Sequence, residues 1–130
     1  MATRIRFRVD FSEECSLGPG KIELLEAISR CGSLSQAARD LNMSYRRAWL
    51  LVESVNSIFR KPVTAAQVGG QHGGGMVLTP FGDTVIQAYR DLEKDIVDRA
   101  GLRMRALSRD VATRGTSPSS LSRRPVTPSR

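Results

Sequence analysis

The stretch GGQHGGG, residues 69–75, places five glycines and the only histidine of the chain within seven positions. A phosphate loop of the GxxxxGK[ST] kind also needs a lysine and a hydroxyl, and Met76 and Val77 stand where these should be. A metal site is not indicated, because His72 has no ligand neighbour at suitable spacing. The stretch therefore favours a hairpin tip, whose glycines allow positive φ and close approach of the backbone to phosphates. Gln71 and His72 would lie nearest such a partner, and a tip that only turns in solvent is the alternative.

A second group with binding chemistry is the segment SYRR, which comprises Ser44, Tyr45, Arg46 and Arg47. Ser44 can cap a helix, and the positive end of a helix favours an anion. Arginine can hydrogen-bond guanine O6 and N7 together, and each such pair discriminates by ~1–3 kcal/mol. We interpret the segment as the reading end of a DNA-binding helix. The alternative is that the arginines form a solvated face and Tyr45 the edge of a core, and Trp49 is expected to pack against the preceding helix.

The elements before and within this region follow from periodicity and capping. Residues 5–11 alternate between apolar and polar side chains, which predicts a half-buried strand with Ile5, Phe7, Val9 and Phe11 on one face. A helix is expected from Gly18–Pro19 to Gly32, with its apolar face formed by Leu24, Leu25 and Ile28. Ser33 and Gln36 form an S-x-x-Q capping box that opens a short second helix carrying Leu34, Ala37, Ala38 and Leu41. A third helix from Ser44 is expected to bury Ala48, Val52, Val55 and Phe59 and to stop at Pro62.

The remainder of the ordered region is predicted to be a hairpin and a long helix. Residues 63–68 and 76–78 suit strands, and Thr79 followed by Pro80 is a cap and a first-turn proline. The helix should run to about Leu107 with apolar residues at helical spacing, namely Phe81, Val85, Tyr89, Leu92 and Ile96. Its own core would cover part of this face, and we expect a homodimer interface over Val85, Tyr89, Leu92 and Ile96.

Helix, short helix, turn, longer helix and hairpin is the order of a winged helix-turn-helix, so the predicted fold class is mainly α with a small β wing. The expected organisation is one domain over residues 1–107, ending in a dimerising helix, and a tail over residues 108–130. The tail is rich in Ser, Thr, Pro and Arg and holds few large aliphatic residues, which predicts disorder. Its charge could add loose attraction to a polyanion or simply keep the chain soluble.

The composition limits the function classes. The 130 residues carry a formal charge of +7 and a pI near 10.4, which favours an anionic partner, nucleic acid first. No apolar run approaches the ~20 residues of a membrane span, and the charged N-terminus does not suit a signal peptide, so we expect a cytoplasmic protein. Cys15 and Cys31 lack CxxC spacing and are expected to be reduced thiols. We do not expect an enzyme, because no nucleophile, base and orienting partner come together.

These motifs resemble a known family. GSLSQAARDLNMSYRRAWLLVESVN, followed by GGQHGGGMVLTPFG, looks like the DNA-binding domain of the molybdate-responsive ModE transcription regulators, which is similar in outline to LysR-type winged helices. The matching patterns are G-S-[LI]-S-Q-x-A, S-Y-[KR]-x-A-W, a GG-x-x-GGG tip and an L-T-x-x-G helix start. They occur in the correct order, and the resemblance runs from about residue 4 to about residue 107.

The resemblance implies a bacterial regulator that binds a palindromic operator in double-stranded DNA as a homodimer. It places helix 44–59 in the major groove, Ser33, Ser35 and Gln36 in the positioning helix, and the hairpin as the wing. Full-length members carry molybdate-binding domains after the long helix, whereas only some twenty residues follow here. We therefore expect no cofactor in this chain, and molybdate only through another domain or partner. A stand-alone member, a regulator governed by a partner and a clipped chain all fit, and the alternative function is a protein-interaction or non-specific architectural module.

Overall fold

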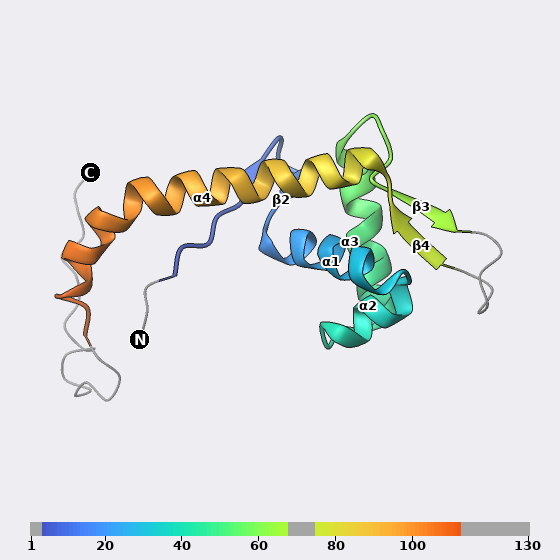
Figure 1. Cartoon of the computed structure of the whole chain (residues 1–130), viewed down its shortest axis with the longest axis horizontal. Coiled ribbons are helices and arrows are strands. Elements are labelled where there is room, and N and C mark those ends of the chain that lie inside the picture. The colour runs from blue at the N-terminus through green and yellow to red at the C-terminus, as the bar shows by residue number, and fades with distance from the viewer. Residues whose placement is uncertain (1–3, 68–74, 113–130) are drawn as a thin grey trace.

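The computed structural model describes residues 4–67 and 75–112 of the chain. Within them, helices α1 to α4 span Pro19–Cys31, Leu34–Asp40, Tyr45–Ile58 and Pro80–Ser108. Strands β1 to β4 span Val9–Asp10, Ser16–Leu17, Thr64–Gln67 and Gly75–Leu78. The first two strands form one antiparallel pair and the last two form another, the wing (Figure 1). The predicted fold class is confirmed: the molecule is mainly α, a winged helix with a long C-terminal helix.

The starts of the helices and the end of α1 agree with the caps that the sequence predicts, whereas α3 ends at Ile58, before the predicted stop at Pro62. Pro19 opens α1, and Gly32 ends it with φ of 73°, a left-handed conformation that glycine adopts without a Cβ penalty. The Ser33 hydroxyl accepts the Gln36 backbone N–H at 3.0 Å and so caps α2. The capping box, however, is only half formed. The Gln36 side chain accepts a hydrogen bond from the Arg39 guanidinium at 2.8 Å, and this contact uses its carbonyl oxygen.

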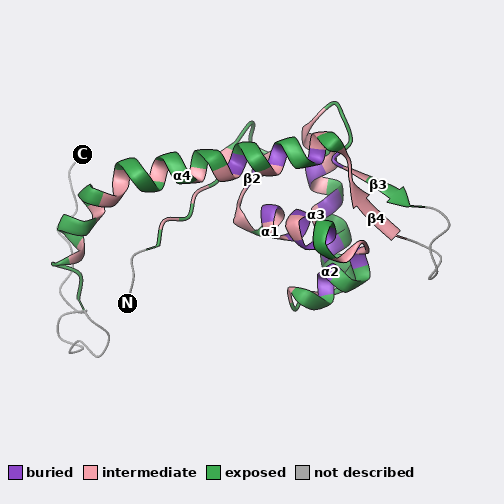
Figure 2. Cartoon of the chain, viewed as in Figure 1, coloured by how far each residue is buried: buried purple, intermediate pink, exposed green. Residues whose placement is uncertain are grey.

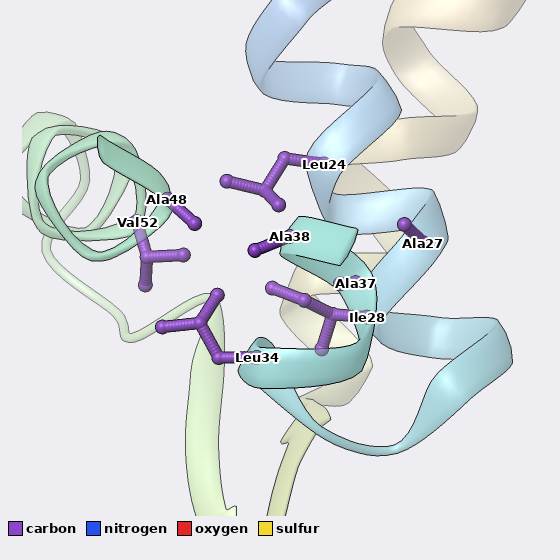
Figure 3. Close-up of a cluster of buried hydrophobic side chains, with 8 residues drawn as sticks. All are labelled: Leu24, Ala27, Ile28, Leu34, Ala37, Ala38, Ala48 and Val52. Atoms are coloured by element: carbon purple, nitrogen blue, oxygen red, sulfur yellow. The ribbon is translucent and has the colours of Figure 1, made fainter. Parts of the chain in front are cut away.

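Two groups of buried side chains hold the elements together. The first lies between α1, α2 and α3 and is built largely from small residues, which let the three helices approach closely (Figure 3). Its buried members are Leu24, Ala27, Ile28, Leu34, Ala37, Ala38, Ala48 and Val52. The second joins α1 and α3 to α4, the base of the wing and the N-terminal strands, through Leu17, Ile22, Leu25, Val55, Val63, Val85 and Tyr89.

The N-terminal segment is extended as predicted, but its strand is shorter. Ile5, Phe7 and Val9 are half-buried and their polar neighbours are exposed, so the alternation holds. The ladder covers only two residues because the partner strand offers only Ser16–Leu17. Phe11 is not on the buried face and is 55% exposed. Hydrogen bonding to α4 holds the segment instead: the Tyr89 hydroxyl donates to the Phe7 carbonyl at 2.7 Å.

Helix α4 is buried only near its start. Its buried residues are Gly82, Val85 and Tyr89, and beyond them the helix is exposed or half-buried (Figure 2). This corrects part of the expected dimer interface, because the side chains of Val85 and Tyr89 belong to the chain's own core. Leu92 is exposed and Ile96 half-buried, so these two remain at the surface. No helix in the described ranges is long and apolar enough to cross a membrane.

Candidate nucleic-acid interface

The start of α3 presents the SYRR segment to solvent. The Ser44 hydroxyl accepts the Arg47 backbone N–H at 3.1 Å, which fixes the first turn of the helix. Tyr45, Arg46 and Arg47 are all exposed, so the alternative that Tyr45 forms the edge of a core is wrong in this structure. The helix therefore opens with hydroxyl and guanidinium groups around backbone N–H groups that lack an intrahelical acceptor.

The packing behind α3 sets its orientation relative to α2. Leu34 and Ala38 of α2 lie toward Ala48 and Val52 of α3 in the first core (Figure 3). The turn between the helices contains Asn42 with φ of 57°, a left-handed conformation that asparagine tolerates better than most residues. These contacts bury the face of α3 that carries Ala48, Val52 and Val55 and leave the amino end of the helix at the surface.

Within the described residues, the arginines at the start of α3 have no acidic partner. Among residues 4–67 and 75–112, neither Arg46 nor Arg47 forms an ion pair. Arg90, by contrast, donates to both carboxylate oxygens of Glu26, at 2.8 and 2.9 Å. That hydrogen bonding raises the pKa of Arg90 above its usual value, with a further contribution from Glu93. Arg90 and Glu26 thus form an ion pair that joins α4 to α1. The guanidinium groups of Arg46 and Arg47, by contrast, are available to an anion.

The structure also places the predicted α2 residues on the surface. Ser35 and Gln36 are exposed. The Gln36 side chain is bonded to Arg39, whose exposed guanidinium the sequence interpretation did not single out. Arg39 lies one turn after Gln36, and this i, i+3 spacing is the signal that could have identified the pair.

The outward face of α3 exposes two apolar side chains, Trp49 and Leu50, that the sequence did not predict there. Trp49 was expected to pack against the preceding helix, but it is 45% exposed. Leu50 is 48% exposed and lines a shallow hollow of about 270 Å³ together with Ser44, Arg46, Arg47 and Leu51. Leu50 falls outside the Ala48, Val52, Val55 stripe, and that offset was visible in the sequence.

The base of the wing is fixed to α3 and α4. The Val63 backbone N–H donates to the Asn56 side-chain oxygen at 2.7 Å, and the Asn56 amide donates to the Thr64 hydroxyl at 3.1 Å. The Thr79 N–H donates to the Val63 carbonyl at 3.0 Å, and the Thr79 hydroxyl accepts the Gly82 N–H at 2.9 Å. Sequence reasoning found the Thr79 cap but missed Asn56, because its partners lie on the wing.

The wing strands pair in register from Thr64 opposite Leu78 to Gln67 opposite Gly75. The Met76 N–H donates to the Gly32 carbonyl at 3.1 Å, so the second wing strand also contacts the end of α1. The predicted contact residues Gln71 and His72 lie outside the described residues. In the described part of the chain, no three His, Cys, Asp or Glu side chains gather in a way that could hold a metal ion.

Known proteins similar to this chain include a molybdenum-pterin-binding protein and ModE transcriptional regulators. No family model matches the chain. The molybdenum-pterin-binding protein MopB of Rhodobacter capsulatus is 44% identical over 80 residues, which cover 62% of this chain and 30% of MopB. The transcriptional regulator ModE of Haemophilus influenzae is 34% identical over 92 residues, 71% of this chain and 36% of that protein. The DNA-binding transcriptional dual regulator ModE of Escherichia coli K12 is 34% identical over 100 residues, 77% of this chain and 38% of that protein.

The chain thus spans about a third of the length of the curated relatives it matches. The described part of the chain that the relatives match forms two helices with serine caps, α2 and α3, and a two-stranded wing. The four sequence motifs and these matches agree, and the chain carries a winged-helix domain of the ModE family.

Proposed function

We propose that this chain binds double-stranded DNA with base preference, as a homodimer, and thereby regulates transcription. The observation that carries the proposal is the amino end of α3, where exposed Arg46 and Arg47 have no acidic partner among the described residues. Ser44 and Tyr45 add hydroxyl donors beside them. In a winged helix this end enters the major groove, where arginine hydrogen-bonds guanine and hydroxyls hydrogen-bond phosphate.

The relatives support regulation of transcription rather than catalysis. Two of them are named as transcriptional regulators, one of which is described as DNA-binding. These names refer to proteins about three times as long as the matched part of this chain. For the described residues we therefore propose contact with DNA, and we propose no oxyanion site. Ser35, Gln36 and the wing residues Gln71 and His72 complete the proposed contact surface.

The homodimer is proposed from α4. Beyond Tyr89 the helix continues to Ser108 with no fully buried residue, although it carries Leu92 and Ile96. A second copy would cover this apolar surface and would present two reading helices to a palindrome. Sedimentation of the full chain at micromolar concentration tests this. We expect a dimer that Leu92→Asp with Ile96→Asp dissociates, and a 14.3 kDa monomer would contradict it.

Selection of duplexes from a random DNA pool tests the proposed function directly. We expect a palindromic consensus, and a steep fall of affinity with salt at a log–log slope of about −0.9 for each neutralised phosphate. Binding without base preference would support an architectural role instead. Absence of binding would leave a protein-interaction module as the alternative. Repeating the selection with and without molybdate shows whether the chain alone responds to the oxyanion.

Paired charge removal separates position from net charge. Arg46→Ala with Arg47→Ala should flatten the consensus at defined positions. Arg103→Ala with Arg105→Ala removes the same charge from the exposed distal part of α4 and should change affinity only modestly, with the consensus intact. Equal effects of the two double variants would contradict the assignment of α3 as the reading helix.

A further inference from the structure

The first two turns of α3 concentrate exposed apolar side chains. Nine large hydrophobic residues are exposed in the described part of the chain, and three of them, Tyr45, Trp49 and Leu50, fall within six positions of α3. Single exposed leucines are ordinary on protein surfaces. Here, however, the apolar groups flank Arg46 and Arg47 in the chain, on the surface that we propose to enter the major groove. Their position therefore calls for a partner that is both anionic and locally apolar.

The geometry of the helix places these groups together. Ala48, Val52 and Val55 point into the protein, so the opposite side of α3 faces solvent. Arg46 and Leu50 are four residues apart, and at 100° per residue they lie on the same strip of that side. Leu50 also lines the hollow with Ser44, Arg46, Arg47 and Leu51, so apolar and positively charged residues share that surface.

Trp49 extends this strip on one side. It follows Tyr45 by four residues, and both are about half-exposed, at 45% and 56%. Helix α3 carries a single acidic residue, Glu53, one turn beyond this cluster. The apolar surface is thus bordered by positive charge toward the start of the helix.

The major groove offers one apolar group to such a surface, the C5 methyl of thymine. We infer that Leu50, with Trp49 beside it, contacts thymine methyls next to the base that Arg46 or Arg47 reads. The half-site then combines guanine with neighbouring thymine, and Leu50 and Trp49 are specificity-determining residues. This inference rests on the proposed function, because it requires α3 to lie in the major groove.

Deoxyuridine provides the probe, since it differs from thymidine only by the missing methyl. Duplexes are first selected by the full chain from a random pool, and each thymine of the half-site is then replaced singly by deoxyuridine. Loss of one contacted methyl should weaken binding by the wild-type chain about fourfold, which corresponds to the ~0.8 kcal/mol for burial of one methylene-sized group. Anisotropy titration with a labelled duplex measures each dissociation constant.

The variants connect the methyl effect to α3. At one half-site position, the Leu50→Ala and Leu50→Gln chains should bind the thymine duplex and the deoxyuridine duplex with equal affinity. The Trp49→Ala chain should lose the same difference in affinity at a neighbouring position. Because these side chains are exposed, the variants should fold, which far-UV circular dichroism checks. Leu102→Ala, an exposed leucine on α4, is the matched control and should keep the fourfold effect.

The outcomes separate this inference from the proposed function. A consensus whose affinity is insensitive to deoxyuridine at every position overturns the inference alone. So does a methyl effect that survives unchanged in the Leu50 and Trp49 variants, since another residue would then make the contact. A chain that retains no duplex overturns the proposed function and the inference together, and the apolar strip would then belong to a protein interface.

Discussion

Replacement of Gly82 by alanine is the sharpest test of how the wing is attached to the helices. Gly82 lies in the first turn of α4, and a Cβ built on it would overlap the Val63 carbonyl oxygen and lie 3.1 Å from Val63 Cγ1. The obstacle is backbone, so it cannot move away as a flexible side chain would. Val63 is also fully buried, and its carbonyl accepts the Thr79 N–H at 3.0 Å. Gly82→Ala must therefore displace either the start of α4 or the base of the wing.

The sign and size of the effect follow from opposing contributions. Overpacking of a buried site costs about 1–3 kcal/mol. Disturbed hydrogen bonds between Thr79 and Val63 add about 1 kcal/mol each. Alanine in place of glycine in a helix returns up to about 1 kcal/mol. We expect a net loss of about 2–4 kcal/mol in the free energy of unfolding, or more than about 8 °C in Tm at 4–8 °C per kcal/mol for a domain of this size.

Gly101→Ala is the matched control within the same helix. A Cβ at Gly101 would meet nothing within 4 Å, so only the gain in helix propensity applies, up to about 1 kcal/mol. Thermal and urea unfolding of the full chain, followed by circular dichroism at 222 nm, measures both variants. The two substitutions should have opposite signs. A Gly82→Ala variant as stable as the wild type would refute the argument, because it would show that the wing base and α4 are not in close contact.

Three further substitutions test other contacts that stabilise the domain. Ser44→Ala removes the α3 cap and should cost about 1 kcal/mol in urea unfolding, and a neutral effect would show that the cap does not hold in solution. Asn56→Ala leaves the Val63 N–H without its acceptor and should cost about 1–3 kcal/mol, whereas Asn56→Asp, which keeps an acceptor, should cost less. Burial raises the pKa of Tyr89 above its ordinary value of 10.0, so its contribution is present at neutral pH and is lost as the pH rises through the folded pKa. Stability should therefore fall above about pH 10, and Tyr89→Phe, which removes the bond to the Phe7 carbonyl, should lower stability at neutral pH and abolish that step.

The sequence predicted the helices well because their ends are determined locally. Pro19 opens α1, Gly32 ends it and Ser33 caps the start of α2, and Ser44 and Thr79 cap the other two helices, as the structure shows. Capping depends on residues three apart, so no tertiary information is needed. The fold class followed from the order of these elements.

Prediction failed where distant segments determine the outcome. Trp49 has the size of a core residue, but Leu34, Ala37, Ala38, Ala48 and Val52 form the buried cluster of α2 and α3, and the ring is 45% exposed. Val85 and Tyr89 have the spacing of a dimer seam, yet α1 and the N-terminal segment cover them within the same chain. Periodicity shows which face of a helix is apolar, and it does not show what covers that face.

The residues that fix the joints between elements and the residues exposed on α3 have different tasks in this domain. Several residues that carry the family patterns are caps or close contacts at joints between elements, as at Ser33, Ser44, Thr79 and Gly82. A match in these patterns therefore predicts the geometry of a winged helix, since each joint fixes an angle or a distance. Under the proposed function, base preference would depend on what that geometry exposes on α3, which in this chain is a pair of arginines beside Leu50 and Trp49. Two proteins that share the joints but differ at these exposed positions should fold alike and select different duplexes, so an exchange of residues 46–50 between them should transfer the consensus without altering the unfolding temperature.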